Sequence, residues 1–320
     1  AQVRESVNTY SKYLSIRSTA VYGGARIHNQ RLKLRKGIDV LVATPGRLLD
    51  LHNQKSVNLK NIEILVLDEA DQMLDMGFIH DIKKIANLLP DRRQNLMFTA
   101  TFSDSFRSLA TNMAEKAIEI SVTNDNETGE NINHYIHPVD KSRKAELLIE
   151  LIKTKKWDQA LVFTRTKHGA DRLQKQLDKV NINSKAIHGN KTQNNRMKAL
   201  EAFKNNKIQI LVATDVAARG IDIKRMSQVI NFDVPTVAKD YVHRIGRTGR
   251  GGDMGEAITL VSADEFRLLR DIEKLINKKL ERVEIEGFEP EHMVPIKDKP
   301  NKKRFHNKKG FKKRNKSRKG

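Results

Sequence analysis

Short apolar runs of strand length alternate along the chain with stretches whose apolar residues recur at a helical period. The apolar runs predict strands over residues 38–43, 62–67, 94–98, 117–122, 159–164, 184–187, 208–213, 228–232 and 256–261. The periodic stretches predict helices that include residues 141–152, 168–180, 192–203 and 264–277. Such alternation is typical of parallel sheets covered by helices on both faces. The pattern therefore predicts an α/β fold.

A polar, glycine-containing stretch without apolar residues interrupts this pattern at residues 123–131. Such a composition is typical of a linker between domains. A chain of 320 residues also has the length of about two ordinary domains. We therefore predict one domain over residues 1–123, a linker over residues 124–131 and a second domain over residues 132–286.

The remaining segment, residues 287–320, is strongly basic. The chain carries a formal net charge of +21, and residues 297–320 alone contain thirteen Lys or Arg and one Asp. So dense a charge with little to bury predicts a disordered tail. The tail either keeps the protein in solution or binds nucleic acid phosphates, with Phe305 and Phe311 able to stack on bases. We favour phosphate binding because a polyanion relieves the repulsion between these charges.

The chain contains no cysteine, so disulfide and thiolate chemistry are excluded. No secretory signal pattern is visible at the N-terminus, and no run of 18 apolar residues occurs. These features predict a soluble, cytoplasmic protein.

Three carboxylates within four residues, Asp68-Glu69-Ala70-Asp71, directly follow the predicted strand over residues 62–67. Ligands of open α/β sheets bind at the carboxyl ends of the strands, and carboxylates there can hold hydrated Mg²⁺ and orient a water. A solvated turn between strand and helix explains this segment equally well when it is considered alone.

Other predicted strands also end in polar motifs. These are Thr44-Pro45-Gly46-Arg47, Thr99-Ala100-Thr101, Thr164-Arg165, Ala213 to Asp222 and, later in the chain, His243 to Arg250. Each motif alone has an ordinary explanation as a turn or a helix cap. Their occurrence together and in this order requires a common one.

With Gly23-Gly24, Asp68-Glu69-Ala70-Asp71, and Gln193 with Arg196, these motifs resemble those of DEAD-box ATP-dependent RNA helicases, most of all the bacterial RhlE-type subgroup. The resemblance extends from residue 1 to about residue 290 and implies two RecA-like domains in tandem. One departure is mild, because Thr99-Ala100-Thr101 replaces the Ser-Ala-Thr common in the family and keeps a hydroxyl.

A second departure concerns ATP binding. The family's phosphate loop, Gly-x-x-x-x-Gly-Lys-Thr, does not occur, and Gly189-Asn190-Lys191-Thr192 has the wrong spacing for one. In the family this loop and a glutamine-containing adenine motif precede the stretch that residue 1 resembles. We therefore expect a fragment whose first domain is incomplete, lacks a central strand and does not hydrolyse ATP by itself.

The resemblance implies a catalytic role for five residues of the first domain. Asp68 would hold Mg²⁺ through water, and Glu69 would position and deprotonate the water that attacks the γ-phosphate of ATP. Thr99 and Thr101 would hydrogen-bond toward Asp71 and couple hydrolysis to closure of the two domains.

In the second domain, Arg247 and Arg250 would be arginine fingers on the γ-phosphate. Their three-residue spacing would put them on one helix face. Surface ion pairs are the ordinary alternative for such arginines. Asp222 would contact the ATP ribose, and His243 and Arg244 would bridge to the first domain.

Further motif residues would contact the RNA sugar-phosphate backbone without reading base edges. They are Gly24, Thr44, Gly46 and Arg47 in the first domain, and Thr164, Arg165, Gly189, Gln193, Arg196 and Thr214 in the second.

The resulting prediction is an ATP-dependent RNA helicase that parts short duplexes when two domains close on RNA. Ribosomal precursors or the RNA-decay machinery are its expected partners. The first alternative is a non-catalytic RNA-binding or annealing protein. A second, a DNA helicase, fits the motifs Asp68-Glu69-Ala70-Asp71 and His243 to Arg247 less well.

Overall fold

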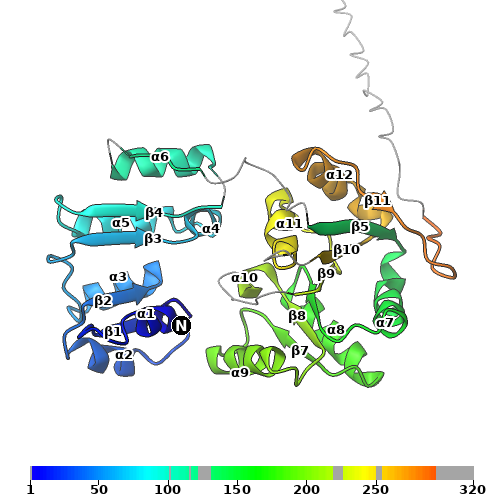
Figure 1. Cartoon of the computed structure of the whole chain (residues 1–320), viewed down its shortest axis with the longest axis horizontal. Coiled ribbons are helices and arrows are strands. Elements are labelled where there is room, and N and C mark those ends of the chain that lie inside the picture. Colours follow the sequence, from blue (N-terminus) through cyan, green and yellow to red (C-terminus); the bar gives the residue numbers. More distant parts are fainter. Residues whose placement is uncertain are drawn as a thin grey trace, which may run out of the picture.

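The computed structural model describes residues 2–100, 102–114, 117–121, 131–218, 226–249 and 254–292 (Figure 1). The strands of the first domain are β1 (Ser18–Val21), β2 (Val40–Ala43), β3 (Ile64–Leu67) and β4 (Gln94–Met97). Its helices are α1 (Gln2–Tyr10), α2 (Ile27–Leu34), α3 (Pro45–Asn53), α4 (Ala70–Asp75), α5 (Ile79–Leu88) and α6 (Asp104–Met113).

The second domain alternates strands and helices in the same way. Its strands are β5 (Ile132–Pro138), β6 (Ala160–Phe163), β7 (Ser184–Ile187), β8 (Ile210–Ala213), β9 (Gln228–Asn231), β10 (Gly255–Val261) and β11 (Glu281–Arg282). Its helices are α7 (Lys144–Thr154), α8 (Lys167–Lys179), α9 (Gln193–Lys204), α10 (Asp215–Ala218), α11 (Ala238–Ile245) and α12 (Phe266–Leu275). Short 3₁₀ turns, Lys141–Arg143 and Ala263–Glu265, precede α7 and α12.

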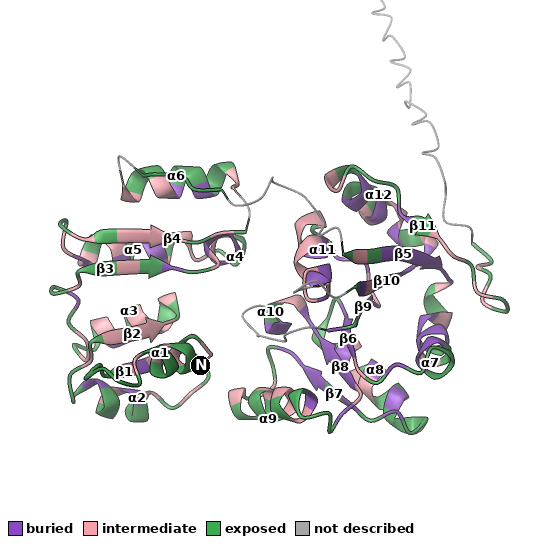
Figure 2. Cartoon of the chain, in the orientation of Figure 1, coloured by how far each residue is buried: buried purple, intermediate pink, exposed green. Residues whose placement is uncertain are grey.

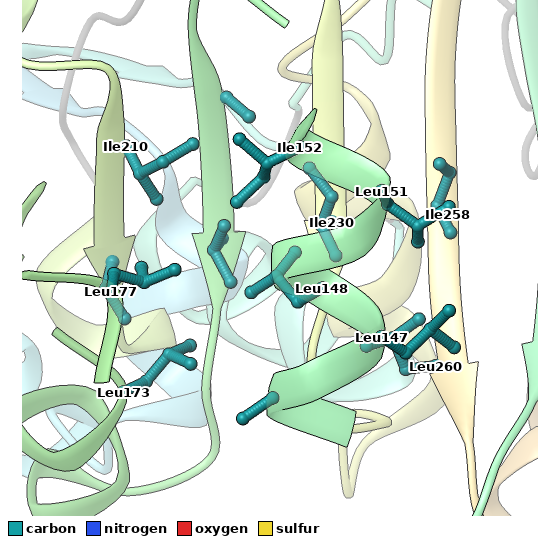
Figure 3. Packing of buried hydrophobic residues seen from close by; sticks show 14 of the residues in the cluster. Leu147, Leu148, Leu151, Ile152, Leu173, Leu177, Ile210, Ile230, Ile258 and Leu260 are labelled. Atoms are coloured by element: carbon teal, nitrogen blue, oxygen red, sulfur yellow. The ribbon is translucent and has the colours of Figure 1, made fainter. Parts of the chain in front are cut away.

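The strands of the second domain form one parallel sheet in the order β11-β5-β10-β9-β6-β8-β7. Helices α7 and α8 pack on one face, where Leu148 and Leu177 meet Ile210 and Ile230 (Figure 3). Helices α9 to α12 cover the other face. Because both faces are covered, β6 and β8 are apolar and buried at every position (Figure 2).

The four described strands of the first domain form two separate parallel pairs, β1-β2 and β3-β4, rather than one sheet. Each pair has its own small apolar cluster. In β3, Leu67 is buried, whereas Ile64 and Val66 on the opposite face are 54% and 51% exposed. The described part of the first domain is thus less completely covered than the second domain (Figure 2).

The strand predicted over residues 117–122 is wrong for its described part, since residues 117–121 are not in a strand and Ile118 is 87% exposed. An apolar run becomes a strand only beside another strand, and no described strand lies next to this one. Three strands, β1, β5 and β11, were not predicted, because β1 begins with two hydroxyl residues, β5 contains two histidines and β11 is two residues long.

The predicted disordered tail begins too early. Val283, Ile285 and Phe288 pack against the core cluster to which α7 contributes. The ring centre of Phe288 lies 4.6 Å from the Arg143 guanidinium, in the turn before α7. Asp140 accepts a 2.8 Å hydrogen bond from the backbone N–H of Glu291. Residues 293–320, and the predicted linker except Asn131, lie outside the described residues. Among the described helices, none has the length and apolar character needed to cross a lipid bilayer.

Candidate composite site between the two domains

The carboxylate segment forms a tight turn between β3 and α4. Glu69 adopts φ of +51°, a conformation that non-glycine residues rarely take and that is often found at functional sites. The backbone N–H of Ala70 donates a 3.0 Å hydrogen bond to the carbonyl of Phe98, directly after β4. This bond brings Thr99, the next residue, beside the carboxylate turn.

Glu69 is half-buried, and burial raises the pKa of its carboxyl group. The nearby charges of Asp68 and Asp71 raise this pKa as well, whereas Arg247 and His243 of the second domain lower it. A carboxylate with a raised pKa is a stronger base than an ordinary glutamate. The second domain thus acts electrostatically on the group best suited to accept a proton.

Asp71 is 4% exposed and faces the second domain. Its Oδ2 lies 4.0 Å from Nε2 of His243, on α11. This contact joins the two domains at the position where the sequence predicted His243 to bridge them.

Arg247 belongs to a loop that is fixed tightly to the second domain. Gly249 has φ of +68°, and a Cβ there would lie 2.6 Å from Cγ1 of Ile132. The buried hydroxyl of Thr248 donates to the carbonyl of Met226 and, at 3.2 Å, to that of Ser227. Arg247 therefore extends from a turn that these contacts hold in place after α11, and not from a helix as its spacing from Arg250 predicted. Thr101, Asp222 and Arg250 lie outside the described residues.

Arg244 does not bridge to the first domain, contrary to the prediction. It is 1% exposed, and its Nε and Nη2 donate to the two carboxylate oxygens of Asp215 at 2.6 and 2.8 Å. Its Nη1 donates to Oδ1 of Asn231 at 3.0 Å and to the carbonyl of Asp233 at 2.7 Å. These partners satisfy the buried charge inside the second domain, so Arg244 anchors α11.

Two side chains hold the Gly23-Gly24 loop of the first domain. The Gln30 amide makes hydrogen bonds of 3.1 and 3.2 Å to the backbone of Tyr22, and Arg47 Nη1 donates to the carbonyl of Ala25 at 3.1 Å. Gly24 has φ of +75°. Gly24 is exposed to solvent, and so are Thr44 and Gly46 at the start of α3. The structure thus gives Arg47 a loop-holding contact that the sequence did not indicate.

The predicted RNA-contacting residues of the second domain follow the carboxyl ends of three neighbouring strands. Thr164 and Arg165 follow β6, Gly189 lies near the end of β7, and Thr214 follows β8. Arg165 and Gly189 are exposed, whereas Thr214 is buried, with 8% of its surface exposed. Thr164 is 0% exposed, so its side chain cannot contact RNA in this conformation, because a residue ending a central strand packs inside the fold.

At the start of α9, Arg196 donates to Oε1 of Gln193 at 3.2 Å and to the carbonyl of Ala217 at 3.3 Å. Burial lowers the pKa of Arg196. Its Nε is buried without a hydrogen-bond partner among the described residues. Gln193 and Arg196 therefore contact each other at the start of α9.

The carboxylate turn fits a hydrated magnesium ion. Asp68 is exposed, and among the described residues no three His, Asp or Glu side chains cluster as a metal cage would require. Mg²⁺ commonly keeps several waters and takes one or two carboxylates plus phosphate oxygens. Asp68 would hold such an ion from one side, and Arg247 would face the phosphates from the other.

The sequence analysis did not single out two buried charged residues beside Arg165 in the second domain. Lys144 and Glu265 form an ion pair near Arg165, with side chains 2% and 5% exposed. The spacing Ser262-x-x-Glu265 is a capping-box signature and could have drawn attention to Glu265. No comparable signal marks Lys144.

Comparison with known proteins covers both domains. Residues 1–109 match the family "DEAD/DEAH box helicase", and residues 143–252 match "Helicase conserved C-terminal domain". The chain is 40% identical over 283 residues to the DEAD-box ATP-dependent RNA helicase CshA of Bacillus cereus, covering 88% of this chain and 54% of that protein. It is 36% identical to the ATP-dependent RNA helicase DbpA of Bacillus subtilis, covering 95% of this chain and 64% of that protein.

The chain therefore spans between about half and two thirds of the length of these relatives. Among solved structures, that of S. cerevisiae Dbp5 bound to RNA and ADP BeF3 is similar, with a TM-score of 0.78 and 31% identity. That likeness covers 88% of this chain and 74% of the Dbp5 chain, and it shows the two RecA-like domains.

Proposed function

The chain belongs to the DEAD-box RNA helicase family, and from this premise we propose that its protein is an RNA-dependent ATPase that separates short RNA duplexes. The observation that carries the proposal is the pairing of charges across the two domains. Oδ2 of Asp71 lies 4.0 Å from Nε2 of His243. The positive charge of Arg247 lowers the pKa of Glu69. Neither half of this site is complete without the other.

In the proposed reaction, Glu69 accepts a proton from the water that attacks phosphorus. The raised pKa of Glu69 suits this task, because it strengthens the base. Asp68 would hold Mg²⁺ through water, and Arg247 and Arg250 would stabilise the negative charge that develops on the phosphoryl oxygens. ATP with Mg²⁺ supplies the γ-phosphoryl group that is transferred to water.

RNA would cross both domains along the exposed ends of strands and loops. Exposed Gly24, Thr44 and Gly46 would present backbone and hydroxyl groups from the first domain. In the second domain Arg165 and Gly189 are exposed, Gln193 and Arg196 are partly exposed at the start of α9, and Thr214 is 8% exposed. The two domains close on ATP and RNA together, and the closed clamp bends one strand and parts the duplex. Asp222 would bind the ribose, and Thr99 and Thr101 would link hydrolysis to this closure.

A second function has a specific observation in its favour. The sequence contains no phosphate-loop pattern, so the 320 residues by themselves would bind or anneal RNA without hydrolysing ATP. We propose that this chain alone lacks turnover and that a protein including the relatives' additional length has it.

Three finer assignments belong to the proposal. The protein is placed in the bacterial RhlE-like subgroup on the strength of its motifs, acts in the cytoplasm, and works on ribosomal precursors or with the RNA-decay machinery. A tree of full-length helicases tests the first, and RNA crosslinked to the protein in cells tests the last.

RNA-stimulated phosphate release, measured on this chain and on the full-length protein, tests the proposed activity. Turnover by the full-length protein that rises with RNA is expected, together with none by the chain. Strong release by the chain would contradict the second statement, and no stimulation of the full-length protein would contradict the first.

A further inference from the structure

Three charged side chains form a compact cluster at the carboxyl ends of β6, β9 and β10. Glu265 lies at its centre and uses both carboxylate oxygens. Oε1 accepts from Arg165 Nη2 at 2.8 Å and from the backbone N–H of Val234 at 3.2 Å. Oε2 accepts from Lys144 Nζ and from the backbone N–H of Ser262, and it shares the Ser262 hydroxyl with Oδ1 of Asp264. The carboxylate is therefore fixed by five donors.

Lys144 is locked in the core beneath Glu265. Its ammonium donates to the carbonyls of Phe232 at 3.0 Å and Leu260 at 2.7 Å, and to Glu265. An ammonium has three N–H donors, so all of them are used. Burial lowers the pKa of Lys144, and the Glu265 carboxylate opposes that change. Three acceptors at these distances favour the charged form.

Arg165 is held from the inside and open on the outside. Within the described part of the chain, its side-chain hydrogen bonds both leave from Nη2, to Glu265 and to the carbonyl of Val234 at 3.1 Å. Its backbone N–H donates to Oδ2 of Asp233 at 2.8 Å. The side chain is 35% exposed. Nε and Nη1 can therefore meet a phosphate while Nη2 stays in place.

The charges of the cluster explain why Lys144 is needed. A carboxylate paired with Arg165 alone would cancel the charge that attracts a phosphate. Because Lys144 already neutralises Glu265, the three side chains together carry one net positive charge. Glu265 can then orient the guanidinium without removing its attraction for RNA.

We propose that Glu265 and Lys144 are positioning residues for RNA: Glu265 holds the Arg165 guanidinium toward a backbone phosphate, and Lys144 keeps that guanidinium's charge effective. The inference rests on the proposed RNA contact of Arg165. It extends the RNA site to two residues that do not touch RNA.

The test measures binding of the chain to a short fluorescent oligouridine at several salt concentrations. Arg165→Ala should weaken binding roughly tenfold, as expected for one charge-assisted hydrogen bond. It should also reduce the slope of log K against log salt by about 0.7, the value for one phosphate of a single strand. In the otherwise unchanged chain, Glu265→Gln should weaken RNA binding several-fold. In a chain that already carries Arg165→Ala, the same substitution should leave RNA affinity unchanged.

Asp264→Asn is the matched control, because Asp264 is the adjacent carboxylate and pairs with Lys141 instead of Lys144 or Arg165. Its Oδ1 also accepts from the Ser262 hydroxyl at 2.5 Å, and the amide oxygen of the variant can still accept that bond. Both substitutions add one positive charge, so net charge alone would make both variants bind RNA more tightly. The positioning role predicts that the two variants differ: Glu265→Gln should bind RNA more weakly, whereas Asp264→Asn should bind it equally or more tightly.

Glu265→Gln leaves a buried ammonium without its carboxylate and can impair folding, so Lys144→Met/Glu265→Gln is the second variant. It removes the whole ion pair, keeps the net charge and is compatible with a stable core. It should also weaken RNA binding several-fold at an unchanged far-ultraviolet spectrum. Unchanged binding by both Glu265 variants would overturn the inference. Unchanged binding by Arg165→Ala would instead overturn the proposed RNA contact.

Discussion

Removing the carboxylate partner of Arg244 should destabilise the second domain strongly. Arg244 is 1% exposed, and Asp215 receives two of its hydrogen bonds, at 2.6 and 2.8 Å. In Asp215→Asn the guanidinium charge stays buried without a carboxylate. The new side chain still offers one amide oxygen, and Asn231 and the Asp233 carbonyl remain as acceptors. Breaking a buried pair in this way costs about 3–5 kcal/mol. Because these acceptors remain, we expect about 3 kcal/mol.

The chain provides its own probe for this measurement. Trp157 is the single tryptophan, lies in the second domain and is 4% exposed, so its fluorescence reports the unfolding of that domain. For a domain of this size, 1 kcal/mol lowers the melting temperature by about 2–4 °C, so Asp215→Asn should lower it by about 6–12 °C.

The exposed pair Lys141–Asp264, at 2.8 Å, is the control, with side chains 70% and 53% exposed. Asp264→Asn should change the free energy of unfolding by about 1 kcal/mol or less, since solvent screens such pairs. If Asp215→Asn melted within about 2 °C of Asp264→Asn, the assignment of Arg244 as the buried anchor of α11 would be refuted.

Three further outcomes are expected. In the full-length protein, Glu69→Gln should abolish RNA-stimulated phosphate release and retain RNA binding in an anisotropy assay; normal turnover would contradict the role of Glu69 as the base. Because the pKa of Glu69 is raised, its carboxylate takes up a proton at a higher pH than an ordinary glutamate does. As the pH is lowered, turnover should therefore begin to fall above the pH range in which an ordinary glutamate is protonated. A rate that stays constant down to that range would contradict the raised pKa. Gly249→Ala should lower the melting temperature followed by Trp157 fluorescence more than Gly287→Ala does. Both glycines have positive φ, but only a Cβ at Gly249 would also lie 2.6 Å from Cγ1 of Ile132. Equal shifts would show that the loop around Gly249 moves to accommodate the methyl group.

The sequence predicted the second domain better than the first for a physical reason. In β6 and β8 every residue is buried, so an apolar run is sufficient to identify each strand. Strand β5 is also buried over most of its length, but its histidines are accommodated by tertiary partners, as when His137 Nδ1 lies 2.6 Å from the Val283 carbonyl. Such partners come from distant sequence, and no local pattern shows them.

The candidate site divides in the same way. The resemblance implied roles for Glu69, Asp71 and His243, and the structure brings these side chains close together between the domains. The motif did not show that Arg244 points into the second domain, where it meets Asp215. Its neighbour His243 points out of the domain from the same helix, and a motif does not specify which partner each side chain contacts. The sequence did not identify Glu265, because its role depends on five hydrogen-bond donors that hold its carboxylate, and most of these donors are distant in sequence.

The two separate strand pairs of the first domain affect how the chain should be handled. Among the described strands, β3 pairs with β4 alone, and its face with Ile64 and Val66 is open to solvent. An uncovered strand edge with apolar residues is a template for pairing between molecules. We therefore expect the purified chain to self-associate through its first domain as its concentration rises. Sedimentation experiments should show this aggregation reduced by Ile64→Lys, while the second domain stays fully folded.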